Sequence, residues 1–360
     1  METNIHTQIK NHAWALVLLL LVFSNVAKAK TVTWTGAVSN IWSNSANWSS
    51  PAWAGVPSAS DDILIPNSAN QPLMDMDVIV SSIVIDGKGK DAILKLDGIH
   101  SLTVTGNITI TNNQTDKILT YSSMLTISNG GNLSGAGEID LTGNGKLFIS
   151  GDLRISNIVA GKTTGSKVVF NGTSQTIDNG KEYHFNDLDI QQGYTTLIHT
   201  NLRIDGNLIG GGTLGGENNK IQLAGDMMLV DYKPGTSTFE LASGEFGVPA
   251  VQQLNANSFY ILENYDQKTV LTGRVKIIHQ VDFEKGNIYL GYHNIYISER
   301  ATLTRGADAQ LSQVQQGSKG YLIANGKGSV KLTDHFLSLK ATGRELDRNI
   351  AAEIGLASGE

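Results

Sequence analysis

A nine-residue phrase occurs four times in this chain and constrains its fold more than any other feature. Each copy runs apolar-x-apolar-x-Gly-Asn/Asp-apolar-x-apolar, except that the third ends on glycine. The copies span residues 102–110, 147–155, 202–210 and 221–229. Apolar residues alternate with other residues on both sides of the glycine, and this period of two is typical of a β-strand with one buried face.

The glycine in the middle of the phrase needs its own explanation. A Gly-Asn pair between two strands usually predicts a two-residue hairpin. In the first copy that hairpin would pair Val104 with Thr109, so apolar and polar side chains would share a face. A three-residue hairpin keeps the alternation, and so does a corner where the chain bends around its own core. At such a corner we expect no room for a Cβ at the inward position. Repetition favours the corner, because short units that cannot bury a face alone stack into coils. We therefore predict a β-solenoid.

The spacing of the copies indicates the length of one coil. Their glycines, Gly106, Gly151, Gly206 and Gly225, are 45, 55 and 19 residues apart. A coil of about 20 residues accounts for the shortest gap and makes the longer ones roughly two or three coils.

Composition excludes several classes of function. Of 360 residues 39 are glycine and 17% are charged, well below the usual share of about 25%, which predicts a polar, uncharged surface. The chain has no cysteine, so disulfides, thiolate metal sites and cysteine nucleophiles are excluded. A formal charge of -6 gives a nucleic-acid partner no electrostatic support.

The first segment has the pattern of an export signal. Lys10 precedes the apolar run 13–23, and a small-x-small cleavage site follows at 27–29. That run is too short for a transmembrane helix, which needs about 20 residues. We predict a signal peptide over 1–29, a mature chain without a membrane span, and a secreted or cell-surface location. An uncleaved membrane anchor is the alternative.

Two segments resemble one known family. Four of the five tryptophans lie in a segment that resembles the opening module of secreted surface proteins of the Bacteroidetes lineage. That module reads W-x-G, N-W and G-x-P-x-x-x-D-D-apolar. The matching residues are Trp34, Gly36, Asn47, Trp48, Gly55, Pro57, Asp61 and Asp62. A later phrase, F-N-G-x-x-Q-x-I followed by F-x-x-L-x-I, resembles the repeat of the same family. It is carried by Phe170, Asn171, Gly172, Gln175, Ile177, Phe185, Leu188 and Ile190, and a weaker copy begins at Phe239 and includes Gln252, Gln253 and Leu254.

The resemblance covers roughly residues 31–331 and implies a parallel β-helix with an adhesin-like role, commonly exported by the type IX route through a C-terminal sorting domain. With the periodicity, it predicts an all-β fold, a right-handed parallel β-solenoid (β-helix) with an aromatic N-terminal cap. We expect a solenoid over 30–331, divided into a Trp-rich cap (30–67) and repeat coils (68–331). Residues 332–360 depart from the family, with a short helical stripe, and are expected to form an atypical tail. Either the chain is shorter than its relatives, or its end is a truncated or altered reading frame; this departure puts type IX export in doubt.

The tryptophans admit two interpretations. Large aromatic side chains cover the open core end of a solenoid, which predicts a cap. Aromatic faces also stack on sugar rings, so the candidate ligand contacts are Trp34, Trp42, Trp48 and Trp53.

No motif in the sequence points to catalysis, a cofactor or a metal. The G-x-G-K at 143–146 lacks the frame of a phosphate-binding loop, and no histidine pair has zinc-ligand spacing. The residues between the apolar positions of the four copies form no column of carboxylates. We predict a non-enzymatic protein that is adhesin-like or structural and contacts glycans or surfaces. The alternatives are a polysaccharide lyase or hydrolase, which needs converging carboxylates and a basic residue, and a stalk with no ligand.

Overall fold

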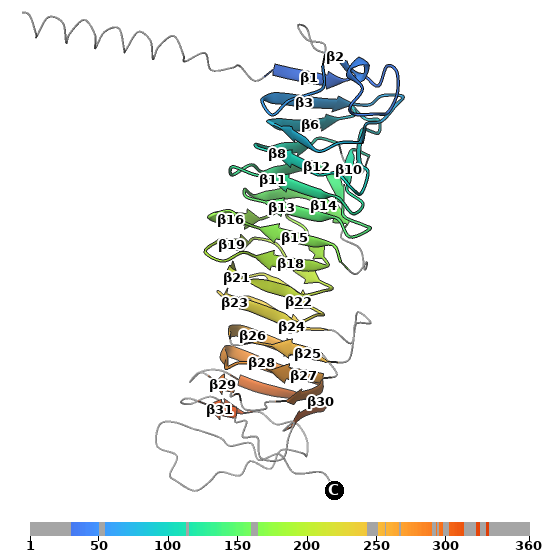
Figure 1. Cartoon of the computed structure of the whole chain (residues 1–360). Coiled ribbons are helices and arrows are strands. Elements are labelled where there is room, and N and C mark those ends of the chain that lie inside the picture. The colour runs from blue at the N-terminus through green and yellow to red at the C-terminus, as the bar shows by residue number, and fades with distance from the viewer. Residues whose placement is uncertain are drawn as a thin grey trace, which may run out of the picture.

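The computed structural model describes residues 30–49, 55–112, 115–159, 165–242, 251–255, 257–265, 268–289, 293, 295–297, 302–312, 322–324 and 329–330. Within these ranges the regular structure is β-strand, apart from one short 3-10 turn, η1 (Ser45–Asn47). The strands pair in parallel from coil to coil and form a β-solenoid of about ten turns, a rod in Figure 1. The predicted all-β solenoid is confirmed. The segments 1–29 and 332–360 lie outside the described residues.

Each coil crosses three stacks of paired strands, which we call faces 1, 2 and 3 in chain order. Face 1 contains β5 (Val78–Val80), β8 (Leu102–Val104), β11 (Met124–Ile127), β13 (Lys146–Ile149), β15 (Lys167–Phe170), β18 (Asp187–Ile190), the first parts of β21 (Leu208–Gly215) and β23 (Met227–Lys233), β25 (Gln252–Leu254) and β27 (Lys268–Leu271). The last parts of β28 (Val275–Tyr289) and β30 (Thr302–Ser312) continue it.

The other two faces are built in the same way. Face 2 contains β1 (Lys30–Trp34), β3 (Asp61–Pro66), β6 (Ser82–Asp86), β9 (Ile108–Ile110), the first parts of β12 (Leu133–Asp140) and β14 (Leu153–Val159), β16 (Ser174–Ile177), β19 (Thr195–Ile198), the second parts of β21 and β23, the first parts of β26 (Ser258–Asn264) and β28, β29 (Ile295–Ile297) and β31 (Leu322–Ala324). Face 3 contains β4 (Leu73–Met74), β7 (Ile93–Leu96), β10 (Lys117–Leu119), the second parts of β12 and β14, β17 (Tyr183–Phe185), β20 (Leu202–Ile204), β22 (Lys220–Leu223), β24 (Thr238–Leu241), the second part of β26, the middle of β28, the first part of β30, and β32 (Ser329–Val330).

The core consists of apolar side chains stacked in register. Leu102 of β8 pairs with Leu125 of β11, and Leu125 pairs with Leu147 of β13. All three are fully buried, while Thr103 and Thr126, which follow Leu102 and Leu125 in their strands, are partly exposed. Burying a leucine side chain stabilises a fold by about 2 kcal/mol. Each coil is therefore stabilised mainly by stacking its apolar side chains on those of the coil before it.

The glycines of the phrase lie at corners, as predicted, but the cause of the restriction differs. Gly106 joins β8 to β9, and Gly151 joins β13 to β14. A Cβ on Gly151 would lie 2.3 Å from the carbonyl oxygen of Gly131, and a Cβ on Gly106 would lie 2.9 Å from that of Ser81. These oxygens belong to the backbone of the preceding coil. The neighbouring coil therefore excludes the Cβ, whereas the sequence argument assigned this role to the core.

The four copies of the phrase occupy two different edges of the rod. The first two copies connect face 1 to face 2, but the last two connect face 3 to face 1, through β20 and β21 and then β22 and β23. The gap of 45 residues is therefore two coils, with Gly131 at the corner between them, and the gap of 19 is one coil. The gap of 55 residues is not a whole number of coils, because the phrase moves by one face.

A ladder of side-chain oxygens explains the Asn or Asp that follows each glycine. Asn107 Oδ1 accepts a hydrogen bond from the N–H of Asn132 (2.9 Å), and Asn132 Oδ1 accepts one from the N–H of Asp152 (2.6 Å). Asp152 Oδ1 in turn accepts from the N–H of Thr176 at 2.9 Å. A second ladder on the other edge repeats this, with Asp187, Asn207 and Asp226 as acceptors. Each Asn or Asp thus fastens the coil that follows it.

The second predicted repeat is also visible in the hydrogen bonds. Gln175 is buried, and its Nε2 donates to the carbonyls of Ile149 (2.9 Å) and Gly151 (2.6 Å). Gln252 makes the same two bonds with Leu223 (3.0 Å) and Gly225 (2.6 Å). Both glutamines therefore span a glycine corner of the preceding coil, one on each of the two edges.

Candidate functional site

The tryptophans that were candidate ligand contacts pack on one another at the N-terminal end of the rod. Trp34 and Trp42 are fully buried and Trp48 is 8% exposed. The ring centroid of Trp48 lies 4.9 Å from that of Trp34 and 4.5 Å from that of Trp42, with the rings edge to face. The first strand edge is closed as well, because β2 (Trp48–Ser49) pairs antiparallel with β1. The buried rings of Trp34 and Trp42 present no face to a ligand in this arrangement, and Trp53 lies outside the described residues.

Exposed side chains of a different kind gather where face 3 meets face 1 in the N-terminal coils. We call this region the Tyr121 edge and define it as residues 75–77, 97–101 and 120–124. These are the turns between β4 and β5, β7 and β8, and β10 and β11 in successive coils, with Met124, the first residue of β11. Its exposed apolar side chains are Ile99 (84%), Tyr121 (45%), Met124 (41%) and Met76 (38%).

The middle turn of the Tyr121 edge is organised by Asp97. Its Oδ1 accepts hydrogen bonds from the N–H groups of Ile99 (2.9 Å) and His100 (2.8 Å). This is an Asx turn, in which an aspartate side chain bonds the backbone that follows it. Its Oδ2 lies 2.6 Å from Nδ1 of His100. Burial opposes the charge of Asp97, but these bonds outweigh burial and hold its pKa below the ordinary value. His100 is therefore oriented by Asp97, and among the described residues its Nε2 has no hydrogen-bond partner.

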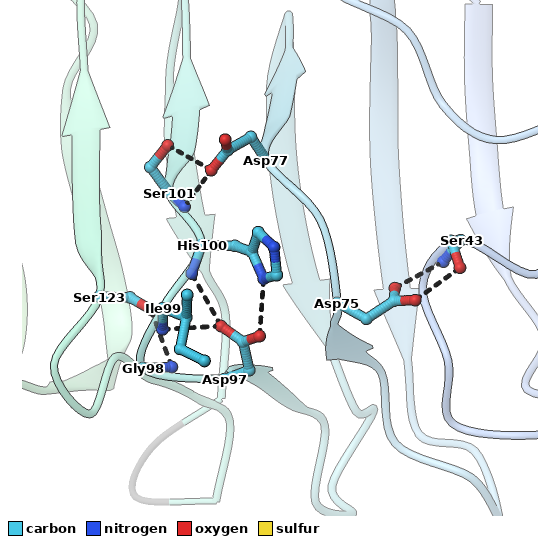
Figure 2. Close-up of polar contacts among 9 residues, drawn as sticks. All are labelled: Ser43, Asp75, Asp77, Asp97, Gly98, Ile99, His100, Ser101 and Ser123. Carbon is cyan, nitrogen blue, oxygen red and sulfur yellow. Dashed lines mark hydrogen bonds and ion pairs between the residues drawn. The ribbon is translucent and has the colours of Figure 1, made fainter.

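A second carboxylate, that of Asp77, fastens the same turn to the preceding coil. Asp77 Oδ1 accepts from the N–H (2.7 Å) and the hydroxyl (2.9 Å) of Ser101. These bonds, the backbone bond first, lower the pKa of Asp77. Asp75 is bound in a similar way by Ser43. Figure 2 shows the His100 ring between the carboxylates of Asp97 and Asp77, and the second oxygen of Asp77 points away from Ser101.

The backbone of Tyr121 has a conformation that L-residues rarely adopt. Its φ is 50°, and it lies between two glycines that are also left-handed, Gly98 (88°) in the preceding coil and Gly143 (81°) in the following one. A Cβ built on Gly98 would lie 3.6 Å from the Cβ of Tyr121, and one on Gly143 would lie 3.5 Å from its Cα. A bulky residue in this region is strained by about 1 kcal/mol, and such strain gathers at functional sites. Two of the other non-glycine residues at positive φ are asparagines, which tolerate it.

Two carboxylates stack outside the four copies of the phrase. On face 3, Glu240 of β24 pairs in register with Glu263 of β26. Lys220 bridges them, in contact with Glu240 Oε2 and 3.5 Å from Glu263 Oε2, and Gln222 Nε2 donates to Glu240 Oε1 at 2.8 Å. Partial burial alone would lower the pKa of Lys220, but the hydrogen bond and charge of Glu240, with those of Glu263, raise it. This cluster has no signal in the four copies of the phrase, because its carboxylates lie outside them and meet only through strand register.

Other sequence expectations can be checked only in the part of the chain that the structure describes. There, no group of three or more His, Asp or Glu side chains is arranged to hold a metal ion. No helix in the described ranges is long and apolar enough to cross a membrane.

Sequence reasoning did not identify the Tyr121 edge, although a signal for it exists. Once the chain is divided into coils, Gly98, Tyr121 and Gly143 fall at neighbouring positions of one edge. A tyrosine placed between two left-handed glycines is then conspicuous. The division itself could not be made from the phrase alone, because the phrase changes edges.

Comparison with known proteins adds one match. A family model described as "Domain of unknown function (DUF8693)" matches residues 33–194. The matched segment is less than half of the 360-residue chain, and it contains the tryptophan cluster and the Tyr121 edge but not Lys220. No curated protein and no solved structure matches the chain.

Proposed function

We propose that this chain is an exported, non-enzymatic protein of the cell surface or extracellular space, which makes adhesin-like contacts with glycans or other surfaces. One observation carries the proposal: apolar side chains, above all Ile99 and Tyr121, are exposed on turns of a solenoid whose core is closed. Such side chains, grouped and bordered by polar residues, are typical of an interaction site.

The turns that carry these side chains are held in place before any partner arrives. Ser123 is buried, and its hydroxyl accepts a hydrogen bond from the N–H of Gly98 at 3.0 Å, which ties two turns of the edge together. The hydroxyl of Ser122 donates to the carbonyl of Gly143 at 2.5 Å and ties the edge to the next coil. A contact surface fixed in this way loses little conformational entropy on binding, which favours repeated weak contacts.

Export is supported by the sequence alone. The segment 1–29 has the charge, apolar run and cleavage site of a signal peptide, and the resemblance to secreted Bacteroidetes surface proteins points in the same direction.

A carbohydrate-active enzyme is the second candidate, and the Lys220–Glu240–Glu263 cluster is the observation that favours it. Two carboxylates and a base on one face are the groups that polysaccharide cleavage uses. However, both oxygens of Glu240 are engaged, one by Gln222 and one by Lys220, and the side chain is 4% exposed. Side chains paired in this way serve coil stacking more readily than proton transfer.

One experiment separates these functions. The purified full chain is applied to a glycan array and to polysaccharide-coated surfaces, and the same polysaccharides are assayed for cleavage. Binding without cleavage is the expected result. If the parent cleaves a polysaccharide and Glu263→Gln does not, the chain is an enzyme and the proposed function is wrong. If the parent neither binds nor cleaves, the chain is a stalk without a ligand.

A further inference from the structure

We propose that the Tyr121 edge is a binding site for neutral glycans, with the ring of Tyr121 as the platform on which one sugar stacks. This inference rests on the proposed function and adds to it a location and a class of ligand. It starts from the contradiction that Tyr121 presents: a bulky, 45% exposed side chain occupies a left-handed position between two glycines.

Packing does not explain why a tyrosine stands there. Glycine adopts this conformation without strain, and asparagine adopts it more readily than other side chains. Tyr121 is 45% exposed and does not belong to the buried core, so the core does not require a ring at this position. What only the aromatic residue supplies is a flat apolar face with a polar tip, which is the kind of surface that amphipathic ligands contact.

The neighbouring groups define the ligand further. Ile99, one coil away, extends the apolar surface, and the coil spacing of about 4.8 Å is comparable to the length of one sugar ring. Asp77 is exposed, and both of its hydrogen bonds with Ser101 use Oδ1. Among the described residues its Oδ2 has no partner and can accept a hydrogen bond from a hydroxyl group. The Nε2 of His100 adds a second polar group, held in place by Asp97. Apolar faces together with hydroxyl-binding groups suit a polyhydroxylated ring.

Charge favours neutral over acidic sugars. The carboxylates of Asp75, Asp77 and Asp97 all lie on this edge, and the last two have lowered pKa values, so they are ionised at neutral pH. A uronic acid or sulfated sugar would be repelled there. Two lysines border the edge: Lys146 pairs in register with Met124, and Lys95 lies two residues before Asp97 and pairs with Leu119.

The test compares four forms of the full chain on neutral glucans and mannans, with polygalacturonate as the acidic probe. Tyr121→Asn removes the ring but keeps a residue that tolerates the left-handed backbone, and it should weaken neutral-glycan binding at least tenfold. Tyr121→Phe should bind within about threefold of the parent. Met228→Ala, at an exposed apolar residue elsewhere on the rod, should bind like the parent. Thermal unfolding should be nearly the same in all four forms.

Each outcome bears on a different claim. If the parent binds neutral glycans and Tyr121→Asn binds equally well, the Tyr121 site is wrong while the adhesin-like function stands. A parent that prefers polygalacturonate would also overturn the inference and point to Lys95 or Lys146. If the parent binds no glycan and no surface, the proposed function itself fails.

Discussion

The side-chain oxygen Oδ1 of Asn132 accepts a hydrogen bond from the backbone N–H of Asp152, 2.6 Å away and one coil further along the rod. Because Asp152 repeats the contact with Thr176, these bonds form a continuous ladder of side-chain oxygens outside the core. The Asn or Asp of the nine-residue phrase therefore joins successive coils, as its apolar residues do in the core.

Replacement of Asn132 by leucine should remove one hydrogen bond from the ladder of side-chain oxygens. The N–H of Asp152 would lose its partner, and an unmade bond of this kind costs about 1 kcal/mol. Asn132→Asp is the matched control, because it keeps the accepting oxygen, as Asp152 itself does in the next rung. Amide hydrogen exchange at Asp152 should accelerate in the leucine variant only. Equal exchange in both variants would show that the side-chain bond is not what protects this N–H.

Replacement of Gly151 by valine should prevent correct assembly. Its Cβ would lie 2.3 Å from the carbonyl oxygen of Gly131, which is backbone and cannot turn away. Gly106→Ala is the milder comparison, since its Cβ would meet the Ser81 oxygen at 2.9 Å. We expect Gly151→Val to be insoluble or to melt far below the parent, and Gly106→Ala to stay folded with a modest loss. A soluble Gly151→Val protein that melts like the parent would refute the explanation of the corner glycines.

Replacement of Gln175 by leucine should destabilise the middle of the rod. The carbonyls of Ile149 and Gly151 would lose the hydrogen bonds that they accept from Gln175 in a buried region. The N–H of Gly172, which donates to Gln175 Oε1 at 2.6 Å, would also lose its partner. At roughly 1 kcal/mol for each group, the loss is about 3 kcal/mol. Chemical denaturation should show it as a lower midpoint. Gln252→Leu should have a smaller effect, because Gln252 donates to two carbonyls and its Oε1 has no partner among the described residues. Its exposed neighbour offers the control, Gln253→Leu, which should be nearly neutral.

Acid should loosen the Tyr121 edge. The pKa values of Asp77 and Asp97 are lowered in the folded chain, so their ionised forms stabilise it. That contribution is complete above the unfolded pKa of about 4 and is lost as the pH falls through the lower folded values. A carboxyl NMR titration should find Asp77 below the ordinary value, and Ser101→Ala should move it upward. An ordinary pKa for Asp77 in the parent would contradict the bonds drawn in Figure 2.

The sequence was sufficient to predict the solenoid, because alternation and corner glycines are local properties that the fold repeats. It was not sufficient to place the copies, because a corner phrase looks the same on every edge. One further copy escaped notice for a simple reason: the turn before Gly131 contains two additional residues, Asn129 and Gly130, which break the spacing. The coil with Asn132, which links Asn107 to Asp152 in the ladder, is therefore indicated in the sequence only by the 45-residue gap between Gly106 and Gly151.

The candidate site was harder to predict than the fold. The tryptophans drew attention because aromatic residues are conspicuous in a sequence, yet Trp34 and Trp42 are buried. Tyr121 has no motif around it, and its backbone angle and its glycine neighbours become visible only when coils are stacked. Likewise, Glu240 and Glu263 lie 23 residues apart in the chain and meet only through strand register.

The shift of the repeated phrase from one edge to another has a consequence for how such a gene can change. A solenoid whose repeats were confined to one edge could gain or lose only whole turns without breaking its pairing. Here the same glycine corner and the same bridging glutamine serve two edges, as Gln175 and Gln252 show. We therefore expect that duplication or deletion of a single strand with its corner, a third of a turn, can be accommodated, so that the length of the rod can evolve in finer steps than its turns.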